Sequence, residues 1–268
     1  MKFIDPHIHM YSRTTDDYEK MALAGIRTVI EPSFWLGQER TSSDTLKDYW
    51  EYLISFEKNR ASEFGINHYC AISVNPKEAN NKEFAENSLL IIKDYLQRES
   101  VVALGEIGFD LISKQEEKIF RKQLLLANEL EIPVIIHTPH INKLEGTKKT
   151  FEIIKEMQID QSRIIVDHNN EDTIELSLSY DVCCGITVYP NTKLSSFRAV
   201  NIMKKYGTDR ILINSSADWG ISDPLSVPKT ALEMELNGFS QNEIEKVLYN
   251  NPNSFFKQSN KYNSTEQK

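Results

Sequence analysis

The sequence is poor in cysteine and has no long hydrophobic run. Its three cysteines, Cys70, Cys183 and Cys184, make no C-x-x-C pair and leave an odd thiol. They therefore predict neither a disulfide framework nor a thiolate zinc site. No stretch approaches the ~20 apolar residues that span a membrane. The first residues also lack a basic segment followed by an apolar one. These absences predict a cytoplasmic protein without membrane insertion.

Basic residues are also fewer than acidic ones. The 268 residues include 31 Lys and Arg against 39 Asp and Glu, a net charge of −8. An acidic balance argues against a broad phosphate-binding surface, although a local basic patch stays open. No linker, low-complexity segment or composition shift divides the chain. We therefore expect a single domain over residues 1–258, followed by a polar, disordered tail over 259–268.

The apolar pattern alternates short β-rich runs with longer helical ones. Continuous apolar runs are typical of parallel strands buried on both faces. Eight such units in about 250 residues predict an α/β fold, a (β/α)8 TIM barrel with an extra C-terminal helix. A doubly wound open sheet is the alternative. The expected strands are 3–9, 27–34, 68–74, 101–109, 134–137, 163–168, 182–189 and 210–218.

Polar residues stand where these expected strands end. In "DPHIHM" (5–10), alternation along a strand would place Asp5, His7 and His9 on one face. In a barrel, the carboxyl ends of all strands meet at one mouth. The residues expected to converge there are His7, His9, Glu106, His137, His168 and Asp218.

Four imidazoles and two carboxylates predict a metal centre. An unpaired buried carboxylate is costly and must find a cation or a proton. Six N and O donors exceed what one tetrahedral ion takes, which favours two divalent ions about 3.5–4 Å apart with a shared carboxylate. We therefore expect one or two divalent metal ions. Zinc is the first choice, with Mn, Mg, Fe, Co or Ni as alternatives.

The combined motifs resemble those of TatD-type metal-dependent hydrolases of the amidohydrolase superfamily. The resemblance covers nearly the whole chain. Three further segments are similar to a TatD-related branch encoded in ebo gene clusters, namely "SRTTDDYEKMA" (12–22), "HTPH" (137–140) and "SADWGISDPLSVP" (216–228). The family motifs are D-x-H-x-H at 5–9, "GEIGFD" at 105–110, "EEKIFRKQLLLANELEIPVIIHT" at 116–138, His168, Asp218 and "NNPNSFF" at 250–256.

The resemblance implies a distorted (β/α)8 barrel and a role for each ligand. His7 and His9 would bind a first metal with Asp218, Glu106 would bridge, and His137 and His168 would bind a second metal. Asp218 would also be the general base that takes a proton from a metal-activated water. We expect Asp5 to orient a ligating imidazole from outside the ligand set. Asp167 is expected to face away from His168 and not to be a ligand.

The chain departs from the family pattern at two places. The family tends to continue the fifth-strand histidine into a serine-arginine pair, whereas Thr138-Pro139-His140 follows here. It also tends to have Glu-Thr-Asp at the eighth strand, where this chain has Asn214-Ser215-Ser216-Ala217-Asp218. Asp223 is therefore an alternative to Asp218. The missing arginine argues against phosphodiester and nucleic-acid cleavage.

Aromatic residues are expected around the mouth. Trp35, Tyr189 and Trp219 are candidate substrate-binding residues, and Arg13 could meet an anionic group of the substrate. His140, just past His137, is a candidate catalytic residue that could protonate a leaving group or hydrogen-bond the substrate. A solvent-exposed loop histidine is the equally simple alternative.

The sequence thus predicts a metal-dependent hydrolase. It would cleave an ester, phosphoester, amide or lactone bond of a small, partly apolar metabolite. One alternative is a TatD-like deoxyribonuclease, a 3'-5' exonuclease on single strands. Another is a metal-binding, non-catalytic component of a biosynthetic complex. An isomerase or aldolase on the same barrel would need a lysine at a strand end, where none is found.

Overall fold

Eight parallel strands lie side by side in chain order. The computed structural model describes residues 1–263. Neighbouring strands pair in parallel from β1–β2 through β7–β8, which confirms the predicted barrel and not an open doubly wound sheet. The strands are β1 (Phe3–Asp5), β2 (Ile26–Pro32), β3 (Asn67–Ile72), β4 (Val101–Gly108), β5 (Val134–His137), β6 (Ile164–Val166), β7 (Cys183–Thr187) and β8 (Ile211–Asn214).

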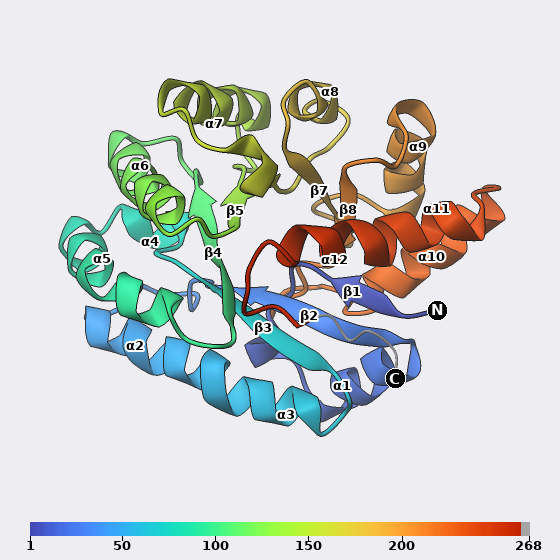
Figure 1. The fold of residues 1–268 in the computed structure, drawn as a ribbon, viewed down its shortest axis with the longest axis horizontal. Coiled ribbons are helices and arrows are strands. Elements are labelled where there is room, and N and C mark those ends of the chain that lie inside the picture. Colours follow the sequence, from blue (N-terminus) through green and yellow to red (C-terminus); the bar gives the residue numbers. More distant parts are fainter. Residues whose placement is uncertain (264–268) are drawn as a thin grey trace.

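Helices surround this sheet (Figure 1). Several begin with a side-chain cap, as at Thr14, Ser113 and Ser240, where a capping box satisfies otherwise unpaired N–H groups. No helix within residues 1–263 is long and apolar enough to cross a membrane. The helices are α1 (Thr15–Leu23), α2 (Ser43–Glu51), α3 (Lys58–Ser62), α4 (Pro76–Ala79), α5 (Lys82–Leu96), α6 (Lys114–Glu129), α7 (Lys143–Glu156), α8 (Ile174–Leu178), α9 (Ser196–Tyr206), α10 (Ser226–Leu236), α11 (Gln241–Glu245) and α12 (Asn251–Phe256), with short 3-10 or π turns η1 (Met10–Ser12), η2 (Tyr52–Glu57), η3 (Gln161–Arg163) and η4 (Lys246–Asn250).

The barrel is joined between β1 and β8 by the segments that follow these strands. The Ser216 amide donates to the His7 carbonyl (2.7 Å), and the His9 amide donates to the Ala217 carbonyl (2.9 Å). The Ser215 amide donates to the Asp5 carboxylate (3.2 Å). Closure between β1 and β8 therefore depends on loop residues. It also holds the first and last candidate site segments together.

The C-terminal helices close the opposite end of the barrel. Phe255 and Phe256 of α12 pack with Ile30, Ala71 and Leu212, apolar residues of β2, β3 and β8. In Figure 1, α11 and α12 run across the front of the barrel beside β1 and β8. The segment "NNPNSFF" therefore seals the barrel end away from the candidate site, and the extra C-terminal helix is confirmed.

The packed chain continues past residue 258, where we had expected the domain to end. Tyr262 is buried, and its ring lies 4.9 Å from the ring of Tyr69. The Lys261 ammonium donates to the carbonyls of Leu96 and Val101. The part of the expected tail from 259 to 263 is thus fixed on the barrel, because it carries a tyrosine that can be buried. The rest, 264–268, lies outside the described residues.

Candidate metal centre

The expected site residues come from strand ends and from the loops just beyond them. Glu106 lies within β4, and His137 is the last residue of β5. The other three histidines lie past their strands, since β1 ends at Asp5 and β6 at Val166. We expected His7 and His9 to share one face of a strand. That expectation is wrong, because neither residue lies in β1. His168 has a left-handed backbone, φ 61°, which strand alternation does not describe.

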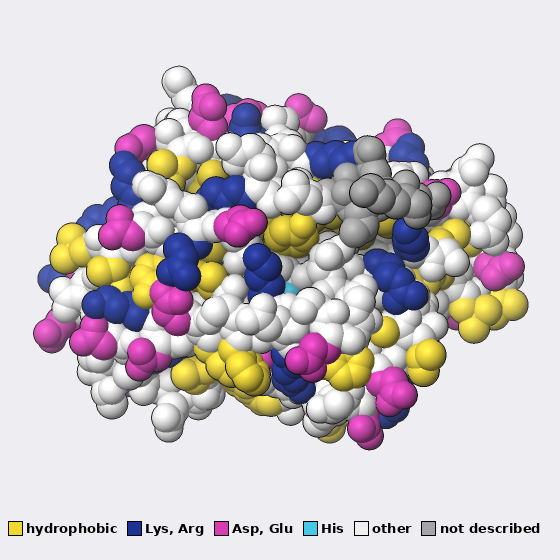
Figure 2. All heavy atoms as spheres, turned by 60° about the horizontal axis from the view of Figure 1, so that its bottom comes forward, with side chains coloured by type: hydrophobic (Ala, Val, Ile, Leu, Met, Phe, Trp, Pro, Cys, Tyr) yellow, Lys and Arg dark blue, Asp and Glu magenta, His cyan; other side chains and the backbone are white. Residues whose placement is uncertain are grey.

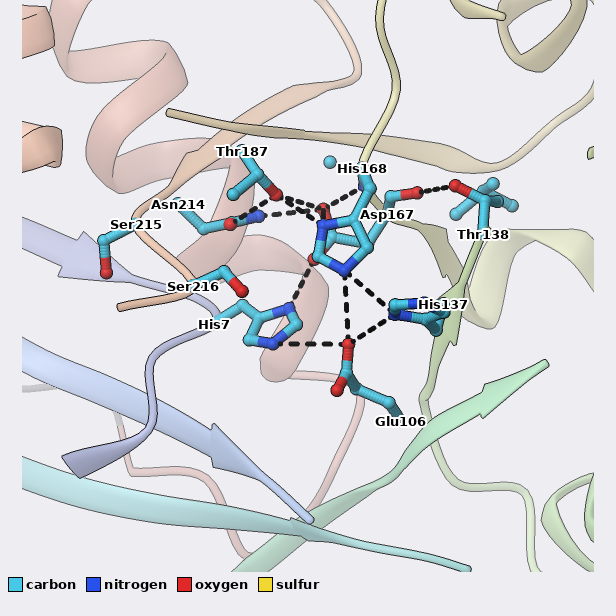
Figure 3. Close-up of polar contacts among 12 residues, drawn as sticks. His7, Glu106, His137, Thr138, Asp167, His168, Thr187, Asn214, Ser215 and Ser216 are labelled. Carbon is cyan, nitrogen blue, oxygen red and sulfur yellow. Dashed lines mark hydrogen bonds and ion pairs between the residues drawn. The ribbon is translucent and has the colours of Figure 1, made fainter. Parts of the chain in front are cut away.

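The imidazoles of His7, His137 and His168 nevertheless meet around the Glu106 carboxylate (Figure 3). Glu106 Oε1 lies 3.4 Å from His7 Nε2, 3.1 Å from His137 Nδ1 and 3.3 Å from His168 Nε2. His9 Nε2 lies 3.2 Å from His7 Nε2. All five residues are buried. The structure therefore brings together five of the six residues that the sequence singled out.

Two of these histidines are oriented through their second ring nitrogen. His7 Nδ1 lies 2.5 Å from Asp167 Oδ2, and His168 Nδ1 lies 2.6 Å from Thr187 Oγ1. Each partner fixes its ring so that Nε2 faces Glu106. An outer partner of this kind is typical of histidines that bind metals.

The carboxylate that orients an imidazole is Asp167 and not Asp5. Asp5 Oδ1 accepts the backbone amides of His7 and Ser215, both at 3.2 Å, and so fixes the loop and not the ring. The expectation that Asp167 faces away from His168 is wrong, because its Oδ1 lies 3.9 Å from His168 Nδ1, whereas its place outside the ligand set stays a prediction. Because β6 ends before Asp167 and His168 turns left-handed, the Asp167 side chain reaches His7 across the barrel.

Asp167 is itself held by several donors. Its Oδ1 accepts the His168 amide at 2.7 Å and the Asn214 side-chain amide at 2.9 Å. The backbone of β7 passes close by, because a Cβ added at Gly185 would lie 2.2 Å from Asp167 Oδ1. The glycine in "CCGIT" thus makes room for the carboxylate.

The electrostatics favour an ionised Glu106. Burial alone would raise the pKa of its carboxyl, but the neighbouring His7, His137 and His168 outweigh this and hold the pKa well below its usual range. Burial, followed by the positive charge of Lys193, lowers the pKa of His168 well below its usual value. The group therefore combines a carboxylate anion with a neutral His168 imidazole, the form in which histidine binds metals.

This donor set fits a divalent cation. Imidazole nitrogen and carboxylate oxygen are ligands of zinc and of other first-row divalent ions. Donor atoms of His7, Glu106 and His168 lie within 4.8 Å of one another. The buried His137 Nε2 has no hydrogen-bond partner within residues 1–263. A cation among these residues would bind the ring nitrogens and the carboxylate oxygen that face one another.

Asp218, the sixth expected ligand, lies apart from this group. Its Oδ1 accepts the Tyr189 hydroxyl at 2.8 Å and the Gly220 amide at 2.7 Å. No hydrogen bond or ion pair within residues 1–263 joins its carboxylate to the five residues. The alternative, Asp223, pairs with Lys229 at 2.5 Å and lines neither cavity described below. A metal-binding role for Asp218 stays a prediction.

A cavity of about 570 Å³ opens above the centre, lined by Glu106, His137 and His168 below and by aromatic residues above. The ring of Trp219 lies 5.0 Å from that of Phe34 and 5.9 Å from that of Trp35. Tyr189 and Asp218 also line this cavity. Arg13 does not, because its guanidinium donates to the Asp218 carbonyl and lies 3.8 Å from Asp17. Three of the four proposed substrate-binding residues therefore share one space.

His140 and two lysines line a second cavity of about 470 Å³ beside the first. The His140 ring lies 6.3 Å from that of His168, and desolvation and the charge of Lys193 lower its pKa. Lys193 and Lys143 were missed from the sequence, because both lie in loops or at a helix start and not at a strand end. No strand end in residues 1–263 carries a lysine, as expected, but these two lysines reach the site from outside the strands. The loop between β7 and α9 is the sequence feature that could have pointed to Lys193.

The chain is similar to known proteins over nearly its full length. Residues 4–257 match the family model described as TatD related DNase. An uncharacterized metal-dependent hydrolase of Methanocaldococcus jannaschii is 34% identical over 263 residues, covering 95% of this chain and 99% of the relative.

Two solved structures show the same fold. A TatD-like protein of Archaeoglobus fulgidus is 25% identical with a TM-score of 0.80, over 95% of this chain and 100% of that one. A TatD homologue of Escherichia coli is 20% identical with a TM-score of 0.70, over 95% of this chain and 98% of that one.

Proposed function

This chain belongs to the TatD related DNase family, and from that premise we propose that it hydrolyses a small, partly apolar metabolite at a divalent metal centre. Its relatives in Methanocaldococcus jannaschii and Bacillus subtilis are named metal-dependent hydrolases. The chain is accordingly an enzyme of the metal-dependent hydrolase type. The bond that it cleaves, of the ester, phosphoester, amide or lactone class, is the proposed part.

The observation that carries this proposal is the orientation of His7 and His168. Asp167 and Thr187 hold the outer nitrogens of these rings, so that both Nε2 atoms face Glu106 Oε1 (Figure 3). Three ring nitrogens converge on a single carboxylate oxygen instead of each taking a partner of its own. A metal site requires that arrangement.

Each residue then has a task. Glu106, His7, His9, His137 and His168 would hold one or two divalent ions, with zinc the first choice. Bound there, such an ion supplies a Lewis acid and lowers the pKa of a water molecule toward ~7. Asp218, oriented by Tyr189 and Gly220, is proposed to accept a proton at the mouth. His140 faces the same space and can hydrogen-bond a leaving group.

The walls of the cavity support an apolar substrate body. Phe34, Trp35 and Trp219 form an aromatic cluster beside the metal centre. Lys77 lies 5.3 Å above the Trp35 ring and is already paired with Asp110. Aromatic walls with few polar groups are typical of small-molecule sites.

Nuclease activity is the second candidate, favoured by the description of the family. Against it stand the net charge of −8 and the Thr138-Pro139-His140 segment in place of a serine-arginine pair. The face shown in Figure 2 carries interspersed basic and acidic side chains, so this one face offers no basic stripe to a nucleic acid. A single-strand nuclease usually offers a positively charged groove.

Two measurements test the proposal. Elemental analysis of protein purified without chelator should find a divalent metal, and His7→Ala and Glu106→Ala should lose it. The metal-loaded enzyme should then hydrolyse members of a panel of aryl esters, aryl phosphates and aryl lactones faster than it degrades single-stranded DNA. Absence of metal, even after its addition, would remove the basis of the proposal. Ready cleavage of DNA with no activity on the panel would favour the nuclease.

A further inference from the structure

Two lysines approach the candidate metal centre from the same side, beside His168. The Lys193 ammonium lies 3.2 Å from His168 Nδ1 and 3.2 Å from Ser216 Oγ. The Lys143 ammonium donates to the His168 carbonyl and to Thr138 Oγ1, both at 3.0 Å. Because both lysines contact His168, two basic side chains border one side of the centre.

In the part of the chain that the structure describes, neither lysine is paired directly with a carboxylate, although the charges of Glu106, Asp167 and Asp218 act on Lys193 and that of Asp167 acts on Lys143. Within residues 1–263, all the hydrogen-bond partners of both ammonium groups are neutral, and neither lysine forms an ion pair. Other basic residues nearby are already paired, since Arg198 binds Glu171 at 2.7 Å and Lys77 binds Asp110 at 3.0 Å. Burial lowers the pKa of both lysines, that of Lys143 to about 7, and a bound anion would favour their charged form.

The space beside them is suited to such an anion. The cavity of about 470 Å³ is lined by both lysines, by His140, and by Asn142 and Leu144 at the start of α7, and its wall also includes the acidic Glu145 and Asp172. Asn142 precedes this 14-residue helix without a side-chain cap, so the N–H groups of its first turn add to the positive potential. Lys193, His140, His168 and Thr192 line this cavity and the aromatic one, which therefore meet at the metal centre.

We propose that Lys193 and Lys143 form an anion subsite for a phosphoryl group beside the metal centre. The substrate would then be a phosphorylated molecule with an apolar body, its phosphoryl group on the two lysines and its apolar part against Trp35 and Trp219. A phosphate dianion matches two ammonium groups in charge, and lysine binds phosphate as a point charge. A carboxylate would match only one of them. This inference extends the proposed function by naming the substrate class.

Binding of inorganic phosphate to the metal-free protein tests the subsite without any turnover. Calorimetric titration should show saturable binding to the wild type. Lys193→Gln and Lys143→Gln should each weaken it by about tenfold, the loss of one charge-assisted contact. Lys193→Arg, which keeps the charge, should retain most of the affinity. Acetate should bind far more weakly than phosphate.

Lys246→Gln is the matched control, because it removes one positive charge from an exposed pair with Asp209 and should leave phosphate binding unchanged. Circular dichroism should show each variant folded. Absence of saturable phosphate binding, equal affinity in folded Lys193→Gln, or equal affinity for acetate and phosphate would overturn the subsite.

The two proposals can fail separately. Phosphate binding that depends on Lys193, in a protein that takes up no metal, would keep the subsite and remove the hydrolase mechanism. Metal-dependent hydrolysis of the uncharged aryl esters, with no effect of Lys193→Gln on hydrolysis of aryl phosphates, would keep the hydrolase and remove the subsite.

Discussion

Asp167 and His7 lie 160 positions apart in the chain, and their side chains meet at 2.5 Å between Oδ2 and Nδ1 in the buried centre of the barrel. The contact links the loop after β6 to the segment after β1. It fixes which nitrogen of His7 faces Glu106, and so it sets the geometry of the whole donor group.

We expect Asp167→Asn to weaken divalent metal binding by about 10- to 100-fold, the usual effect of losing an outer partner of a ligating histidine. The amide cannot hold the His7 ring through the same charged contact. Competition with a chromophoric chelator measures the affinity. Asp5→Asn is the matched control, since within residues 1–263 Asp5 hydrogen-bonds the backbone of His7 and the backbone and side chain of Ser215 but no imidazole ring, and this variant should bind metal with the wild-type affinity. Equal losses in both variants would contradict the role given to Asp167.

Gly185→Ala should disturb the same carboxylate from the neighbouring strand. The added Cβ would lie 2.2 Å from Asp167 Oδ1, closer than such atoms approach, and the His168 amide and Asn214 hold the carboxylate in place. Overpacking of this kind costs about 1–3 kcal/mol of unfolding free energy, and metal affinity should fall as well. Urea unfolding measures the loss of unfolding free energy.

The clash predicts a coupling between the two positions. In an Asp167→Ala background the carboxylate is gone, and Gly185→Ala should cost less unfolding free energy than in the wild type. Equal costs in both backgrounds would show that the strain lies elsewhere, for example against the Asp167 backbone.

The barrel could be predicted from the sequence because its signal is repeated. Eight apolar runs alternate with helical periods, and parallel strands buried on both faces leave few alternatives. Strand ends were less predictable. β1 stops at Asp5 and β6 at Val166, where loops and the left-handed His168 take over, and no periodicity marks those points.

The donor residues could be found because carboxyl ends of strands meet at one mouth. The residues that orient these donors could not be found from the sequence. Asp167 and Thr187 are brought to His7 and His168 by closure of the barrel, and Lys193 is brought there by the loop after β7. Those contacts depend on backbone turns, which the alternation of apolar and polar residues does not encode. From the sequence we therefore gave Asp5 the role that Asp167 holds in the structure.

The cysteines are predicted to be unreactive in the folded protein. Burial raises the pKa of Cys183 to about 11 and that of Cys184 to about 12, and holds that of Cys70 well above its usual value. A raised thiol pKa keeps the protonated, unreactive form, so at pH 8 only about one Cys183 thiol in 10³ is a thiolate.

Iodoacetamide at pH 8 should therefore label the native protein very slowly, whereas all three thiols should react in denaturant. Mass spectrometry counts the labels. Rapid labelling of native protein would contradict the burial of Cys70 and Cys184 and the raised pKa of the partly buried Cys183.

Trp219 offers the clearest test of the aromatic wall, because it is 46% exposed and can be removed with little cost to the core. Its ring meets those of Phe34, Trp35 and Tyr11 at the cavity mouth. We expect Trp219→Ala to raise KM for aryl substrates by about tenfold, since stacking of an aromatic pair contributes about 0.5–1.5 kcal/mol beyond the area that it buries. The turnover number should change less, because the residue holds the substrate body and not the reacting bond. Leu90→Ala, which removes an 80% exposed side chain from α5, should leave both constants unchanged. A fall in the turnover number with an unchanged KM would instead place Trp219 with the reacting groups, through Asp218 beside it.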